Sequence, residues 1–181
     1  MDSTTIVTRA NDGSPVAESK TYQQLAQEGG MPIGGLLYLI GIGVFFLPIR
    51  LAISVYSEIW PTFTDGTWQI LTTPTGQLYS PYWGPLLITE FTVNLLLVAA
   101  SIWMLYLFVT KKRQFPNWYV GFITFNVAFI TIDAYVVTLL IPENPIFDKE
   151  TMRALLQSLF ALGLWGTYLK ISNRSKATFI H

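Results

Sequence analysis

The sequence predicts an all-α membrane protein, a transmembrane four-helix bundle, from three observations. Of its 181 residues, 51% are apolar and only 12% are charged, whereas about a quarter of the residues in a soluble domain are charged. Four apolar stretches are each long enough to supply the roughly 20 helical residues that cross a bilayer. Basic residues gather near the ends of these stretches, as is typical of membrane helices.

The segment 1–31 has a different composition from the rest of the chain. It is polar and has neither a helical nor a strand period, so it predicts a flexible cytoplasmic tail. A short helix at 21–27 is compatible with its sequence. A four-span membrane domain is expected to follow at 32–171, with a cytoplasmic C-terminal tail at 172–181.

The first span is expected at about 33–56. Its several glycines are tolerated in membrane helices and allow close helix packing. The segment 57–83 contains prolines, the turn dipeptide Asp65-Gly66 and many Trp and Tyr residues. Because aromatic side chains favour the membrane interface, this segment predicts an ordered, aromatic-rich periplasmic loop. Residues 67–72 have weak strand character, which suggests a short hairpin within the loop.

The other three spans are expected at about 85–110, 118–141 and 152–169. Basic residues follow the second span and the fourth span, and cytoplasmic segments are enriched in Lys and Arg. This pattern predicts that both termini are cytoplasmic. The five candidate topology residues, with contacts to anionic lipid as a secondary role, are Lys111, Lys112, Arg113, Arg174 and Lys176.

The composition also argues against several classes of function. There is no cysteine, and the one histidine is His181, so a metal site built from Cys or His is not expected. Eleven basic and eleven acidic residues cancel, so the chain has no net positive charge to attract nucleic acid. No phosphate loop or catalytic nucleophile is recognisable, and the sequence therefore predicts no cofactor and no enzymatic activity.

Ionisable residues within the spans provide the sharpest functional signal, because a charge at the centre of a span costs about 2.5–3.5 kcal/mol on insertion scales. We predict a cluster of Arg50, Glu90 and Asp133 in the outer half of the membrane, with Arg153 near its mouth. Helical spacing adds Asn94, four residues after Glu90, and Gln157, four residues after Arg153. Such a cluster either binds a ligand or only fixes how the helices assemble. The sequence is compatible with both hypotheses.

Five stretches resemble a family of small bacterial inner-membrane proteins that is known only as a domain of unknown function. They are Gly34–Leu37 with Leu47–Arg50, Leu71–Trp83, Glu90 with Asn94, Lys111–Pro116, and Trp165–Tyr168 with Ser172–Phe179. The resemblance covers residues 33–180 and implies four spans in the bacterial inner membrane. The family pattern often has a proline between the Trp and Tyr of the last span, where this chain has Gly166 and Thr167.

Three functions compete on this sequence. The favoured one is an accessory or scaffold protein that packs against a membrane partner, which is another membrane protein or a second copy of the chain. The alternative is a binder or transporter of a small polar solute or lipid headgroup, with Arg50 holding an anion and Glu90 or Asp133 a cation or proton. An intramembrane enzyme that uses the two carboxylates as an acid/base pair ranks last.

Overall fold

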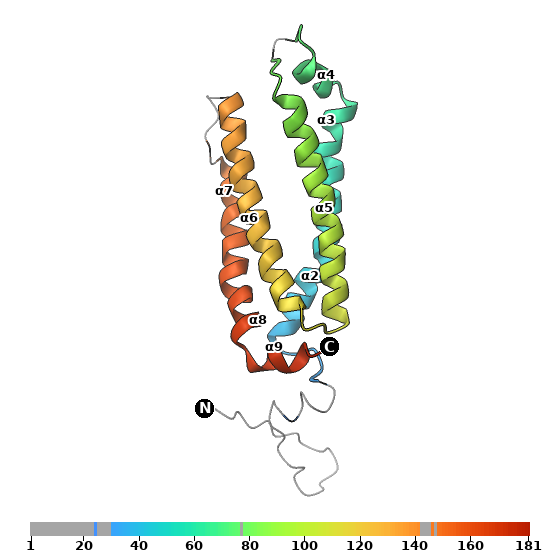
Figure 1. Cartoon of the computed structure of the whole chain (residues 1–181), viewed down its shortest axis with the longest axis vertical. Coiled ribbons are helices and arrows are strands. Elements are labelled where there is room, and N and C mark those ends of the chain that lie inside the picture. Colours follow the sequence, from blue (N-terminus) through green and yellow to red (C-terminus); the bar gives the residue numbers. More distant parts are fainter. Residues whose placement is uncertain (1–23, 25–29, 77, 142–145, 147) are drawn as a thin grey trace, which may run out of the picture.

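The computed structural model describes residues 24, 30–76, 78–141, 146 and 148–181, and within these residues every regular element is helical (Figure 1). Four of the helical stretches are long and apolar enough to cross a membrane. This confirms the predicted all-α class with four candidate spans. Apart from residue 24, the predicted helix at 21–27 lies outside the described residues, as does the tail before residue 30.

The first span runs from Leu36 to Thr64 without interruption. It consists of α2 (Leu36–Ser54), a π-helical stretch η1 (Val55–Ile59) and α3 (Trp60–Thr64). The prediction ended this helix at 56 because the prolines and the turn dipeptide of 57–83 interrupt the apolar pattern. However, the helix continues: the Trp60 N–H, at the end of η1, donates to the Val55 carbonyl, and Pro61 follows directly at the start of α3.

The predicted strand at 67–72 is wrong, because these residues form the helix α4 (Thr67–Thr72). Asp65 accepts a hydrogen bond from the backbone N–H of Thr67 at 2.9 Å. Gly66 has a φ of 92°, a left-handed conformation that glycine adopts at little cost. Together these two residues turn the chain into a new helix, and Trp68 then stacks on Phe63 of α3 with ring centroids 5.4 Å apart. The predicted periplasmic loop is therefore helical over most of its first half.

The other spans are α5 (Trp83–Val109), α6 (Phe115–Leu140) and a composite of α7 (Lys149–Ala161), η2 (Leu162–Gly166) and α8 (Thr167–Ile171). The last begins three residues before the predicted boundary, because Asp148 caps it: its Oδ1 accepts the Thr151 N–H at 2.7 Å. The π-helical stretch η2 makes this span irregular near Gly166, although the span contains no proline.

After Ile171 the chain turns and forms a final short helix, α9 (Asn173–Thr178), across the end of the bundle (Figure 1). The Met31 N–H donates to the Ala177 carbonyl at 2.9 Å, so the segment entering the first span meets the segment leaving the last one. Residues 30 and 31, which were predicted to belong to a flexible tail, are therefore packed against the bundle. We call this the tail end, and the opposite end, with α3 and α4, the loop end.

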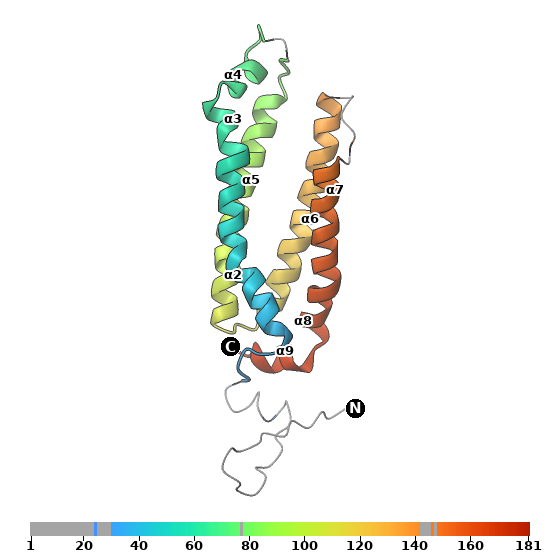
Figure 2. The same ribbon diagram turned by 180° about the vertical axis from the view of Figure 1, so that it is seen from behind.

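The four spans form two antiparallel pairs, α2–α3 with α5 and α6 with α7–α8. Figures 1 and 2 both show the pairs close together at the tail end and separated toward the loop end. Burial follows this shape. The buried residues of α2, α5 and α6 lie in the tail-end part of each helix, within 37–44, 97–108 and 115–123 respectively. The hydrophobic core of the bundle is therefore concentrated in its tail-end half.

Candidate functional site

Two of the predicted cluster residues come together. Glu90 of α5 lies on the helical face that continues into buried Leu97 and Ser101, and Asp133 of α6 lies on the face that begins with buried Tyr119. Both carboxyl groups are half-buried, and they lie within electrostatic range of each other. The facing sides of α5 and α6 thus carry two acids in the loop-end half of the bundle.

The predicted basic members do not join this pair. Arg50 is exposed and forms no ion pair with any residue in the described part of the chain. It follows buried Val44 by six residues, so it lies about 120° around α2 from the face that packs on α5. A long arginine side chain at such a position extends toward the membrane interface.

Arg153 and Gln157 are also exposed. They precede and follow buried Leu155 by two residues, which places each of them about 160° around α7 from the buried face. The expected mouth of the cluster therefore does not form from these two side chains. Their i, i+4 spacing correctly put them on one face, but that face is the outer one.

The neighbouring amides are occupied within the bundle. The side-chain amide of Asn94 donates to the backbone carbonyl of Glu90 at 2.9 Å. Asn126, which lies between Tyr119 and Asp133 on the inner face of α6, accepts a hydrogen bond from the Ser158 hydroxyl of α7 at 3.4 Å. Each amide thus makes one hydrogen bond within the bundle, whereas neither carboxyl group is paired with a basic side chain among the described residues.

The tail end contains buried groups that the sequence prediction did not place. Ser175 and Thr178 are fully buried, and Phe179 is 3% exposed. The Phe179 ring stacks on Phe115 at 4.7 Å and also contacts Phe108 at 5.8 Å between centroids. Residues 172–179, one of the stretches that carry the family resemblance, thus include side chains packed against the bundle.

Arg174, predicted as a topology residue, packs against a glycine pair. Its guanidinium lies so close to Gly34 that a Cβ added at Gly34 would overlap the Nη2 atom. Gly35 has a φ of 59°, a left-handed conformation that favours glycine. The Nε atom of Arg174 is buried without a hydrogen-bond partner among the described residues. Lys176 is exposed.

The basic turn after α5 also holds the end of the chain through its backbone. The Arg113 N–H donates to the His181 carbonyl at 2.6 Å, and the His181 N–H donates to the Lys111 carbonyl at 3.3 Å. Lys111 has a left-handed φ of 52°, and the backbone N–H of Lys112 donates to the Leu107 carbonyl. The turn therefore contributes to docking of the C-terminus, in addition to its predicted effect on topology.

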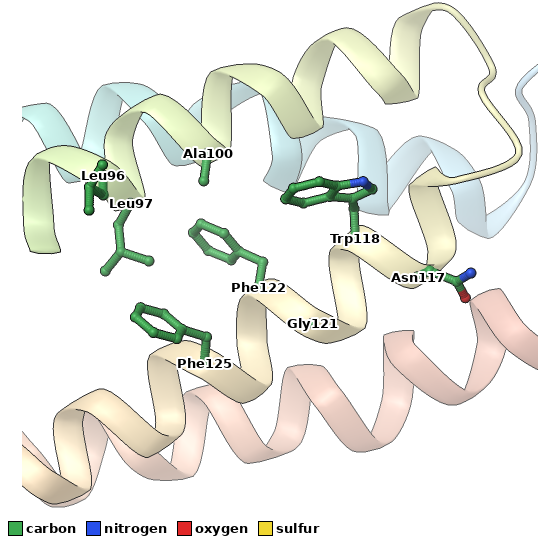
Figure 3. A pocket seen from close by; sticks show the side chains of 8 residues that line it. All are labelled: Leu96, Leu97, Ala100, Asn117, Trp118, Gly121, Phe122 and Phe125. Carbon is green, nitrogen blue, oxygen red and sulfur yellow. The ribbon is translucent and has the colours of Figure 1, made fainter.

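A second feature is an apolar groove of about 450 Å³ between α5 and α6 (Figure 3). Leu96, Leu97 and Ala100 form its α5 wall. Along α6 the aromatic side chains point toward that wall, and the glycine between them leaves space. The α6 lining consists of Asn117, Trp118, Gly121, Phe122 and Phe125.

The architecture and the outward-facing apolar surface define a multi-pass membrane protein with four candidate spans. Residues 31–180 match DUF2569, a family described as a protein of unknown function, and the chain belongs to this family. No curated protein and no solved structure matches the chain. Within the described residues, no group of three or more His, Cys, Asp or Glu side chains is placed to hold a metal ion.

Proposed function

We propose that the chain is an accessory protein of the membrane that receives a transmembrane helix of a partner against the loop-end parts of α5 and α6. The observation that carries this proposal is the carboxyl pair of Glu90 and Asp133, which is half-buried on the facing sides of the two helices. An uncompensated charge within a span is costly. A basic side chain on a partner helix would pair with these acids and hold the partner in one register.

The form of the bundle supports this assignment. The two helix pairs separate toward the loop end (Figure 2), and the fully buried residues of α5 and α6 stop before that region. Polar contacts between membrane helices contribute only about 0.6–2 kcal/mol each. The acid pair would therefore select the partner and its register, while apolar packing along the same faces would supply most of the contact.

We also propose that the tail end faces the cytoplasm of a bacterial inner membrane. Lys111, Lys112, Arg113 and Lys170 lie in or near the turns at the tail end, and basic residues near span ends favour the cytoplasmic side. A cysteine introduced at Lys112 should be labelled by a membrane-impermeant thiol reagent only after the cells are opened. Labelling in intact spheroplasts would reverse the orientation.

Site-specific photocrosslinking in growing cells tests the partner proposal. Ile130 lies between Asn126 and Asp133 on the inner face of α6 and is half-buried, whereas Ile132 is 62% exposed on the same helix. A photoreactive phenylalanine at position 130 should give one discrete adduct, and one at 132 should not. Glu90→Gln combined with Asp133→Asn should abolish the adduct. An adduct that persists at full yield in this double variant would contradict recognition through the acid pair.

The mass of the adduct distinguishes two kinds of partner. An adduct with twice the mass of the chain would identify a second copy, in which case the exposed Arg50 or Arg153 of that copy would supply the cation. Any other discrete mass would identify a different membrane protein. The same full-length variants serve both comparisons.

A second candidate function is binding of a small cationic solute by the same two carboxylates. Their mutual proximity favours it, because two acids without an internal counter-charge attract a cation. Spermidine or Mg²⁺ should then raise the Tm of the purified wild-type protein, and the double variant should lose this increase. Stabilisation by the solute without a crosslink from position 130 would favour this function over the accessory role.

A further inference from the structure

The groove between α5 and α6 opens sideways toward lipid. Leu96, Trp118 and Phe125, which line it, are 62%, 45% and 52% exposed respectively. They belong to helices that are long and apolar enough to span the membrane. The groove is therefore accessible from the hydrocarbon region, and its volume of about 450 Å³ falls within the range of about 300–1,000 Å³ that is usual for small ligands.

The groove also extends over most of the length of one lipid leaflet. From Asn117 to Phe125 the lining advances along α6 by about 12 Å, at about 1.5 Å per residue. The hydrocarbon core of a bilayer is about 30 Å thick, so one leaflet contributes about 15 Å. Asn117 lies in the first turn of α6, at the tail end, and Phe125 lies deeper. An acyl chain that enters at the headgroup level would run along this groove toward the membrane centre.

The lining of the groove has one polar residue, Asn117, which lies at the tail end, and a basic residue of α8 lies next to it. The Oδ1 atom of Asn117 accepts a hydrogen bond from the Lys170 amino group of α8. Figure 3 shows Asn117 turned toward this neighbouring helix, away from the aromatic side chains. The Asn117 amide N–H groups and the remaining Lys170 protons can donate to an anion. Basic pockets between membrane helices are known to hold phospholipid headgroups.

We propose that this groove binds one anionic phospholipid, with an acyl chain between α5 and α6 and the phosphate beside Lys170 and Asn117. Asn117 and Lys170 lie beside the tail end of the groove, and the apolar lining continues from there toward the membrane centre, so the polar groups and the apolar lining follow the order of a headgroup and its acyl chain. This site lies in the tail-end half of the bundle, so it is separate from the Glu90 and Asp133 pair and does not depend on the proposed partner.

Two glycines provide a matched pair of variants for the apolar part of the site. A Cβ added at Gly121, within the groove, meets no atom within 4 Å, and the same holds at Gly43 of α2, which is outside the groove. Both residues are exposed and helical. The Gly121→Leu side chain therefore starts from a Cβ in open space within the groove lining, and Gly43→Leu makes the same chemical change at an open position outside the groove.

The test is native mass spectrometry of the purified full chain with phosphatidylglycerol or phosphatidylcholine of identical acyl composition. The wild-type protein and Gly43→Leu should saturate with one bound phosphatidylglycerol, and Gly121→Leu should reduce this occupancy at least tenfold. Lys170→Gln should lower phosphatidylglycerol binding to the level of phosphatidylcholine and leave the latter unchanged. Unaltered binding by Gly121→Leu, unaltered headgroup preference by Lys170→Gln, or adducts that never saturate would overturn the proposal.

Ala100→Leu narrows the groove from the opposite wall and gives an independent measurement. If circular dichroism shows that Gly121→Leu has lost its helical structure, the decision rests on Ala100→Leu. Reduced occupancy in a folded Ala100→Leu protein supports the site, and unchanged occupancy overturns it.

Discussion

Replacing Phe179 with alanine should release the last residues of the chain from the tail end of the bundle. The ring is 3% exposed and contacts Phe115 and Phe108. Truncating a buried Phe to Ala costs about 3–5 kcal/mol. Because α9 is short and joins the bundle only at this end, we expect most of this cost to appear as undocking of α9, with the spans still folded.

The expected magnitude follows from that free energy. A loss of about 3–5 kcal/mol raises the population of the undocked state by about two to four orders of magnitude. Hydrogen exchange measured by mass spectrometry in nanodiscs should therefore accelerate at the amides of Lys176 and Phe179, which donate to Ser172 and Ser175 in the docked helix. Exchange in α5 should remain nearly unchanged.

A control variant is available in the same region. Ile171 is 68% exposed, so Ile171→Ala removes a large apolar side chain eight residues earlier without opening the packed cluster. Its exchange rates at 176 and 179 should match those of the wild-type protein. Equal rates in Phe179→Ala and Ile171→Ala would refute the conclusion that the Phe179 contacts hold α9 in place.

Two further predictions concern helix packing and capping. Gly41→Ala should destabilise the protein by about 1–3 kcal/mol, because its Cβ would lie 2.8 Å from the Phe108 ring. Gly43→Ala should be neutral or stabilising, since no atom lies within 4 Å of its Cβ. The Tm of each variant, measured in detergent, is compared with that of the wild-type protein. The Thr151 N–H bond lowers the pKa of the Asp148 carboxyl, so its cap stabilises α7 above the unfolded pKa and is lost as the pH falls below about 4. Asp148→Asn keeps a cap at every pH, so its Tm should rise relative to the wild-type Tm on acidification; a constant difference would contradict this.

The positions of the membrane helices could be predicted from the sequence because they depend on length and hydropathy, which are properties of each segment alone. The boundaries were less accurate where a single side chain decides them. Asp148 extends the last span by capping it, and Asp65 with Gly66 starts α4 in a segment with strand-like composition. These effects depend on local hydrogen bonds and a left-handed φ, which the mean hydropathy of a segment does not detect.

The candidate site was predicted in part for a similar reason. Spacing along one helix places Glu90 with Asn94, and Arg153 with Gln157, on common faces. Spacing does not reveal which face points inward, and this requires the buried residues of the same helix. Val44 and Leu155 mark those faces in α2 and α7, and they leave Arg50 and Arg153 on the outside.

Different forces hold the two ends of the bundle. Within a bilayer, contact between apolar helices gains little from the hydrophobic effect, because lipid tails are equally apolar. The segment after Ile171 lies beyond the last span, so burial of Phe179 removes its ring from water and carries the full driving force. The tight tail end therefore forms where aqueous burial is available. The loop-end half lacks this contribution, and its buried residues are fewer, in agreement with the separation of the two helix pairs toward that end.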